Sequence, residues 1–261
     1  SQHIETFKSK GHRVFQHPSH LAMSSAQGTF VPPTLIELKH IGELQREVFG
    51  PVLHLVRYAR SDLDRLLDQI NATGYGLTQG VHTRIDETIA RVVNRAHAGN
   101  VYVNRNMVGA VVGVQPFGGE GLSGTGPKAG GPLYLLRLLS QRPANALART
   151  LAEADRTSPP DTERRDRQLA PLGTLQQWAH HQGDLALAGH CQRFAQETQS
   201  GTARTLPGPT GERNVYTLAP RARVLCLAPS ADDLLVQTAA VLASGGTALW
   251  PSAQASLHAK L

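Results

Sequence analysis

Between residues 29 and 104, short strand-like runs alternate with stretches of helical periodicity. The strand-like runs are rich in branched apolar residues and are bounded by glycine or proline, as strands commonly are. In the helical stretches apolar side chains recur three and four residues apart, and Ser61 stands where an N-cap is expected. Because parallel neighbours need a helical crossover, this order predicts an open α/β sheet with parallel pairs. The expected elements are strands at 34–38, 51–59, 79–83 and 100–104, and helices at 61–70 and 85–96.

A polar stretch separates this region from a second one. Residues 157–167 (TSPPDTERRDR) contain prolines and charges but few apolar side chains, which is the composition of a linker. Beyond it the pattern is helical at 172–198, then a loop at 206–214, and then strand, helix and strand between 223 and 250. The chain is therefore expected to have three parts: an α/β region at 1–150, a linker at 151–168, and an incomplete, Rossmann-like α/β region at 169–261.

Composition argues against several classes of protein. The 261 residues are 40% hydrophobic and 18% charged, which is enough to bury a core, and no stretch approaches the roughly 20 apolar residues of a membrane span. We therefore expect a cytoplasmic globular protein. The net charge of +6 raises nucleic acid as a partner, but basic residues are scattered, and the densest run, 163–167, is interleaved with acids. A nucleic-acid partner is not expected through this segment.

Short motifs for other chemistries lack the context that they need. Residues 119–124 (GEGLSG) match the dinucleotide fingerprint, yet no helix start follows to hold a pyrophosphate. A phosphate-binding loop would need a lysine where Pro127 stands, and no G-x-S-x-G elbow marks a serine hydrolase. The histidines near Cys191 are too far apart along one helix to bind a metal, and Cys191 and Cys226 are expected in the core. These motifs predict no catalytic residue and no metal site.

Two other features are more informative. Residues 109–132 (GAVVGVQPFGGEGLSGTGPKAGGP) are too rich in glycine for a helix or a strand interior, which predicts a long surface loop. Residues 47–51 (EVFGP) place a carboxylate and an aromatic ring at a rigid corner before a strand. The Glu47 carboxylate could accept hydrogen bonds from sugar hydroxyls, and the Phe49 ring could pack on a flat ligand. The simpler interpretation is a helix-to-strand corner with Phe49 in the core.

Several of these runs together resemble a known family. Residues 47–51 resemble the E-x-F-G-P motif of the aldehyde dehydrogenase superfamily, and residues 99–104 (GNVYVN) resemble the strand that follows it. Further runs are similar to the glutamate semialdehyde dehydrogenase module of the bifunctional proline utilisation A flavoproteins. They are GTFVPPT at 28–34, VGVQPFGG at 112–119 and SGTGPKAGGP at 123–132. The resemblance covers about residues 1–142 and resumes at 206–251, where longer members have a C-terminal domain.

The resemblance implies the C-terminal portion of an aldehyde dehydrogenase catalytic domain, which oxidises L-glutamate γ-semialdehyde to glutamate with NAD. By similarity, Glu47 would hold the nicotinamide ribose and Phe49 would pack near the nicotinamide. The main-chain amides of Gly109 and Ala110 would bind the substrate carboxylate, and Phe117 would wall its aliphatic part. The parent protein would also carry a proline dehydrogenase with FAD, and it would form homo-oligomers.

One departure from the family pattern limits what this chain can do. The family's nucleophilic cysteine precedes E-x-F-G-P, whereas Cys191 and Cys226 both follow it. We therefore expect a slice of a longer polypeptide that lacks the nucleophile and is inactive without the remainder of the parent. The alternative is a non-catalytic scaffold or assembly module that keeps the aldehyde dehydrogenase fold.

Overall fold

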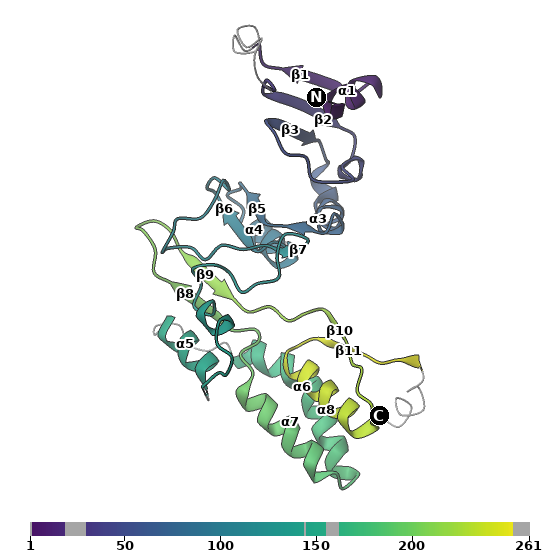
Figure 1. The fold of residues 1–261 in the computed structure, drawn as a ribbon, viewed down its shortest axis with the longest axis vertical. Helices are drawn as coiled ribbons and strands as arrows, with labels where there is room; N and C mark the ends of the chain where they lie inside the picture. The colour runs from purple at the N-terminus through teal and green to yellow at the C-terminus, as the bar shows by residue number, and fades with distance from the viewer. Residues whose placement is uncertain (1, 19–29, 144, 155–161, 253–261) are drawn as a thin grey trace. The chain divides into compact units, whose positions relative to one another are not determined.

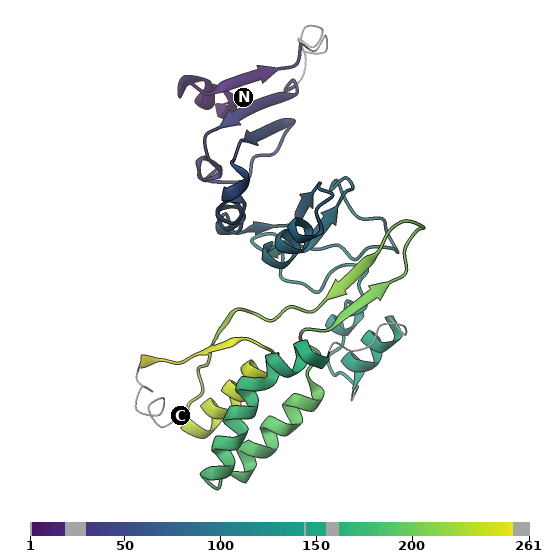
Figure 2. The same cartoon turned by 180° about the vertical axis from the view of Figure 1, so that it is seen from behind.

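A computed structural model of the chain describes residues 2–18, 30–143, 145–154 and 162–252 (Figure 1). The chain divides into two compact units, one of residues 1–110 with 117–128 and one of residues 111–116 with 129–261. Each unit combines helices and strands, as the view from behind also shows (Figure 2), so the predicted α/β class is confirmed. No helix in the described part of the chain is long and apolar enough to cross a membrane.

The first unit begins with a three-stranded sheet in the order β1-β2-β3. β1 (Arg13–Gln16) is antiparallel to β2 (Thr34–Leu38), and β2 is parallel to β3 (Val52–Val56). Ile36 and Leu38 of β2 are buried with Phe7 of helix α1 (Gln2–Ser9), because alternate residues of a strand point to one face. The strands predicted at 34–38 and 51–59 are confirmed as a parallel pair, whereas α1 and β1 have no counterpart in the prediction.

The rest of this unit holds the second predicted set of elements. β5 and β6 form a parallel pair, in the register Thr78↔Asn100 to Val81↔Val103, which confirms the predicted pairing. The short strands β4 and β7 pair with each other in antiparallel fashion. The bounds are Leu63–Ala72 for α3, Tyr75–Gly76 for β4, Thr78–Val81 for β5, Asp86–Arg95 for α4, Asn100–Val103 for β6 and Glu120–Gly121 for β7.

The start of α3 differs from the prediction. A 3-10 turn covers Arg60–Asp62, so Ser61 lies inside this turn and Asp62 is the residue that precedes the helix. No side-chain capping bond forms there. The predicted N-cap role of Ser61 is therefore wrong, because the chain is already turning before the helix begins.

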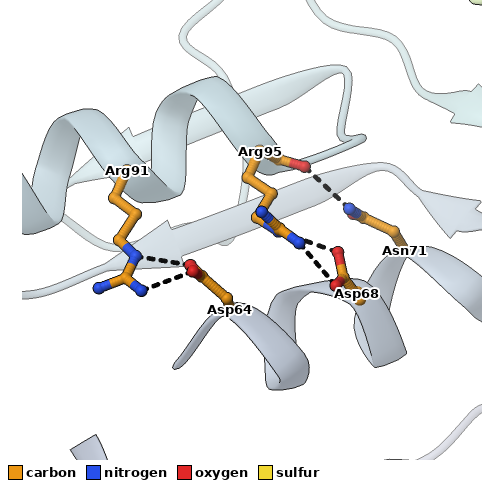
Figure 3. A network of polar contacts seen from close by, with 5 residues as sticks. All are labelled: Asp64, Asp68, Asn71, Arg91 and Arg95. Carbon is orange, nitrogen blue, oxygen red and sulfur yellow. Dashed lines mark hydrogen bonds and ion pairs between the residues drawn. The ribbon is translucent and has the colours of Figure 1, made fainter. Parts of the chain in front are cut away.

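Two arginine–aspartate pairs join the exposed sides of α3 and α4 (Figure 3). Two guanidinium nitrogens of Arg91 donate to the carboxylate of Asp64. Arg95 donates to Asp68 in the same way, at 2.9 and 2.6 Å, and Asn71 donates to the main-chain oxygen of Arg95 at 2.8 Å. The two aspartates are four residues apart on α3, and the two arginines are four residues apart on α4. The pairs therefore join two successive turns of one helix to two successive turns of the other.

We expect these pairs to make the stability of the first unit depend on pH. Hydrogen bonds from Arg91 and Arg95 lower the pKa values of Asp64 and Asp68, respectively. A carboxyl group with a lowered pKa in the folded state stabilises the fold above its unfolded pKa, and this contribution is lost as the pH falls through the folded pKa. We expect the free energy of unfolding, measured in urea between about pH 6 and about pH 3, to fall less steeply in Asp64→Asn/Asp68→Asn than in wild type.

Asp86→Asn provides the matched control for this experiment. Asp86 lies in the first turn of α4, and it forms no ion pair with any residue that the structure describes. In Asp86→Asn, the free energy of unfolding should therefore fall with decreasing pH almost as steeply as in the wild type. Equal steepness in the double variant and the wild type would show that the two pairs do not contribute to the pH dependence.

The second unit is built around three helices, α6 (Thr162–His181), α7 (Leu185–Glu197) and α8 (Ala231–Ala243), which lie side by side in both views. A parallel pair, β10 (Arg223–Leu225) and β11 (Thr247–Leu249), flanks α8 in the sequence, as the predicted strand-helix-strand order requires. The buried core of the helices consists of Leu172, Leu175, Ala179, Leu187, Ala188, Cys191, Leu235, Ala239 and Ala243.

Three further elements complete this unit. α5 spans Ala146–Ala154, and a 3-10 turn at Leu135–Arg137 occupies the stretch for which a helix or a strand is expected. An antiparallel hairpin consists of β8 (Ala203–Leu206) and β9 (Asn214–Thr217), with Leu206 opposite Asn214 at its closed end. The sequence pattern predicts only the loop of this hairpin.

Two predictions for this unit are corrected. The segment expected as a linker, 151–168, is helical at both described ends, since α5 runs to Ala154 and α6 begins at Thr162; residues 155–161 lie outside the described residues. The charged residues 165–167 are exposed on α6, because a charge-rich composition also suits the solvent face of a helix. The helical pattern at 172–198 is two helices, with a break at Gly183, whose φ of +74° ends the first.

Candidate functional site

The predicted corner at 47–51 lies between the 3-10 turn Ile41–Glu43 and β3. Gly50 has a φ of +136°, which glycine adopts without a steric penalty. The carbonyl oxygen of Pro51 accepts a hydrogen bond from the amide of Thr34 at 2.8 Å, so the corner is tied to the start of β2. Phe49 is 89% exposed, and the interpretation that places its ring in the core is therefore wrong: the corner turns the ring outward.

Two carboxylates near this corner differ in their partners. Glu43 accepts hydrogen bonds from the amides of Lys39 and His40 and lies 2.8 Å from Nε2 of His12. Burial acts to raise the pKa of Glu43, but these hydrogen bonds and the nearby histidines outweigh it and lower the pKa. Glu47 is exposed and has no hydrogen bond or ion pair with any described residue. Of these two carboxylates, Glu47 is thus the one that is available to accept hydrogen bonds from hydroxyl groups of a ligand.

The glycine-rich loop begins with two main-chain amides that have no acceptor among the described residues. They belong to Gly109 and Ala110, which follow β6 and are half-buried. No atom lies within 4 Å of the position that a Cβ on Gly109 would take, so the space beside this amide is open. The amide of Val111, by contrast, donates to Oε1 of Gln115 at 2.9 Å. Two adjacent donors beside open space suit a carboxylate.

Further along, the same loop packs backbone against backbone next to β6. A Cβ on Gly99 would stand only 1.7 Å from the carbonyl oxygen of Gly118. The amide of Gly118 donates to Oδ1 of Asn100 at 3.3 Å, and Oγ of Ser123 accepts from the amide of Gly76 at 3.1 Å. Phe117, which is half-buried, precedes this packed stretch. The chain needs glycine here because the two backbones leave no room for a side chain.

Residues 119–124, which match the dinucleotide fingerprint, form β7 and a turn. The prediction of a continuous loop at 109–132 therefore holds except at Glu120–Gly121, which pair with Tyr75–Gly76. Gly121 permits a close approach here, because a Cβ on it would stand 2.5 Å from the carbonyl oxygen of Gly74. Within the described residues up to 143, only a short 3-10 turn follows, so no helix begins where a pyrophosphate would need one. The predicted lack of a helix start after this motif is confirmed within these residues.

The two thiols of the chain are poorly suited to nucleophilic chemistry. Cys191 lies in α7 and Cys226 directly follows β10, and both are buried, as predicted. Burial raises the pKa of each thiol, which disfavours the reactive thiolate. The part of the chain that the structure describes contains no group of three or more metal-ligating side chains.

The five predicted site residues belong to two segments, the corner at 47–51 and the glycine-rich loop. Gly109 and Ala110 are adjacent in the loop that contains Phe117, but no hydrogen bond or ion pair among the described residues joins this loop to Glu47 or Phe49. A groove of about 1250 Å³ lies elsewhere in the first unit, beside α3, α4 and β5, where apolar side chains of α3 and mostly polar side chains of α4 line it. None of the five predicted residues lines it.

One group of polar residues is absent from the sequence prediction. Gln115 is buried, and its Nε2 donates to Oε2 of Glu212 at 2.8 Å and to Oδ1 of Asn214 at 3.5 Å. The sequence separates Gln115 from these partners by almost one hundred residues, so no local pattern could reveal the contact. A polar residue between Val114 and Pro116 in a loop was the available signal, and it is weak by itself.

Comparison with known proteins finds relatives of this chain. The bifunctional protein PutA of Salmonella typhimurium is 62% identical over 252 residues, which cover 95% of this chain and 19% of that protein. The 1-pyrroline-5-carboxylate dehydrogenase of Staphylococcus aureus is 44% identical over 119 residues, or 45% of this chain and 23% of that protein. Proline utilization A from Corynebacterium freiburgense superimposes with a TM-score of 0.65 at 25% identity, covering 93% of this chain and 23% of that one.

The chain thus spans about one fifth of the length of the curated relatives that it resembles. The aldehyde dehydrogenase family matches residues 1–142, which include the corner at 47–51 and the whole glycine-rich loop. On this match, which extends over more than half of the sequence, the chain belongs to the aldehyde dehydrogenase family.

Proposed function

We propose that this chain is the C-terminal part of an NAD-dependent L-glutamate γ-semialdehyde dehydrogenase that acts in proline catabolism. The observation that carries the proposal is the pair of free main-chain amides at Gly109 and Ala110, in a chain whose relatives are PutA and 1-pyrroline-5-carboxylate dehydrogenase. The dehydrogenase part would cover residues 1–150, with the second α/β region at 169–261 attached to it. The parent polypeptide would act in the cytoplasm and would also carry a proline dehydrogenase with FAD.

The substrate is an aldehyde that bears a carboxylate, and the loop would recognise the carboxylate. Two amides without acceptors among the described residues would donate hydrogen bonds to this anion. The half-buried ring of Phe117 lies in the same loop and would cover the aliphatic carbons of the substrate. An aldehyde without a carboxylate would leave both amides unpaired, so the loop would favour the acid-bearing substrate.

The corner at 47–51 fits the nicotinamide riboside end of NAD. Glu47 has an exposed carboxylate with no partner among the described residues, and Phe49 presents an exposed ring two positions later. The carboxylate would accept the ribose hydroxyls, and the ring would limit the positions that the nicotinamide can take. When bound, NAD supplies the acceptor for the hydride that the substrate loses. The rest of the dinucleotide would be held outside this chain, since the fingerprint at 119–124 is not followed by a helix.

The nucleophilic thiol would come from the part of the parent that precedes this chain in the family pattern. Cys191 and Cys226 are buried with raised pKa values, and neither lies in the glycine-rich loop. This chain would therefore position the substrate and the cofactor but would not form the covalent bond. The scaffold alternative is less well supported, because the relatives include a protein named as a dehydrogenase.

The test compares residues 1–261 with the full-length parent by the formation of NADH from L-glutamate γ-semialdehyde. We expect activity only in the parent, and Glu47→Gln in the parent should raise KM for NAD by about tenfold, because a neutral amide is a weaker acceptor than a carboxylate. Gln45→Ala, at an exposed position two residues away, is the control. Activity of residues 1–261 alone, or a parent without aldehyde oxidation, would contradict the proposal.

A further inference from the structure

A buried glutamine links the glycine-rich loop to the β8–β9 hairpin. Gln115 is only 8% exposed, and both ends of its side-chain amide have partners. Its oxygen accepts from the amide of Val111 at 2.9 Å, and its nitrogen donates to the carboxylate of Glu212 at 2.8 Å. The amides of Val114 and Gln115 both donate to the carbonyl oxygen of Val111 at 3.0 Å. Gln115 therefore closes a tight turn from inside and is itself held from the hairpin.

The hairpin contributes to this contact from the first residue of β9 and from the loop before it. Asn214 is the first residue of β9 and pairs with Leu206 at the end of β8. Its Oδ1 faces Nε2 of Gln115, while its Nδ2 is buried and has no acceptor among the residues that the structure describes. A Cβ on Gly208 would stand 2.3 Å from that nitrogen, so the glycine allows the hairpin loop to close over Asn214. The reverse orientation of the amide would set two N–H donors against each other.

We propose that Glu212 and Asn214 are positioning residues for the anchor amides of the glycine-rich loop, and that they act through Gln115. Val111, whose amide Gln115 fixes, directly follows Gly109 and Ala110 in the chain. The Glu212 contact is a hydrogen bond to a charged group, so it is stronger than one between neutral groups. This inference rests on the proposed function, because it concerns the amides that would bind the substrate carboxylate.

The positioning role predicts an effect that depends on the substrate. When Glu212 is removed, the turn at 111–115 loses its outer support and the two preceding amides are less well directed. An aldehyde with a carboxylate needs those amides, whereas an aldehyde without one does not. A rise in KM for the first substrate alone would separate positioning from a general weakening of the fold.

The experiment uses the full-length parent and compares L-glutamate γ-semialdehyde with propanal. We expect Glu212→Ala to raise KM for glutamate semialdehyde by about fivefold to tenfold, with kcat within about twofold and both constants for propanal unchanged. Glu212→Gln should restore most of the lost affinity, since its amide oxygen still accepts from Gln115. Arg213→Ala, at the next position, is the matched control, because Arg213 is exposed and has no hydrogen bond to Gln115 in the described part of the chain.

Thermal unfolding of each variant shows whether it is folded. An equal loss with both aldehydes, or an unchanged KM for glutamate semialdehyde in both Glu212→Ala and Asn214→Ala, would overturn the positioning role while leaving the proposed function intact. A wild-type parent that oxidises glutamate semialdehyde no better than propanal would instead contradict the proposed function.

Discussion

Replacement of Gly99 by alanine is expected to lower the free energy of unfolding by about 3 kcal/mol or more. The new Cβ would stand 1.7 Å from the carbonyl oxygen of Gly118 and 2.9 Å from Cα of Gly119, and both obstacles are backbone atoms. A flexible side chain could rotate away, whereas here the loop itself would have to move. Such a shift would also break the hydrogen bond from the amide of Gly118 to Asn100.

Gly109→Ala is the matched control, since it lies in the same unit and has nothing within 4 Å of its Cβ position. Its stability should change by less than about 0.5 kcal/mol. Urea unfolding of the two variants and the wild type measures the difference. If Gly99→Ala were as stable as Gly109→Ala, the close packing of the loop against β6 would be wrong.

The local sequence pattern was sufficient to predict those helices and strands whose apolar spacing is visible within a few residues. β2 has the predicted bounds. α3 and α4 differ from their predicted bounds by one or two residues at each end. β-branched runs and apolar residues at helical spacing report directly on which side chains are buried. The parallel pairing of β5 with β6 follows from the helix between them, because a crossover fixes the relative direction of the strands.

Elements that depend on distant partners were missed. β8 and β9 have four residues each and only a few apolar side chains, so they resemble the loop that joins them. β1 is formed by pairing with β2 across a long connection. The break between α6 and α7 was more accessible, because Gly183 followed by Asp184 is an ordinary end and N-cap: Oδ1 of Asp184 accepts from the amide of Leu187 at 2.9 Å.

The candidate site also has features that the sequence indicates and features that only the structure reveals. The resemblance of short motifs to a family identified Glu47, Gly109 and their neighbours, although composition alone favoured a buried Phe49. Only the three-dimensional contacts show that the carboxylate of Glu47 and the amides of Gly109 and Ala110 have no partners among the described residues. Neither the local sequence pattern nor the family resemblance predicted the hydrogen bond from Gln115 to Glu212, because the two residues lie far apart in the sequence.

A substitution in α7 tests the core of the second unit. Leu187→Ala should lower the free energy of unfolding by about 2 to 5 kcal/mol, because Leu187 is only 3% exposed and packs in the cluster shared by α6, α7 and α8. The loss combines the removed apolar area with the cavity that the neighbouring helices cannot fully close. Its hydrogen bond to Asp184 uses the main-chain amide and is unaffected by the change.

Leu185→Ala separates this packing effect from any effect on helix formation. Leu185 begins the same helix, but it is 71% exposed, so the same chemical change there removes little buried area. We expect it to alter stability by less than about 0.5 kcal/mol. Because leucine and alanine differ little in helix propensity, any difference between the two variants in urea unfolding reports on burial. Equal losses at both positions would mean that α7 does not pack through Leu187, and the three-helix core described above would be wrong.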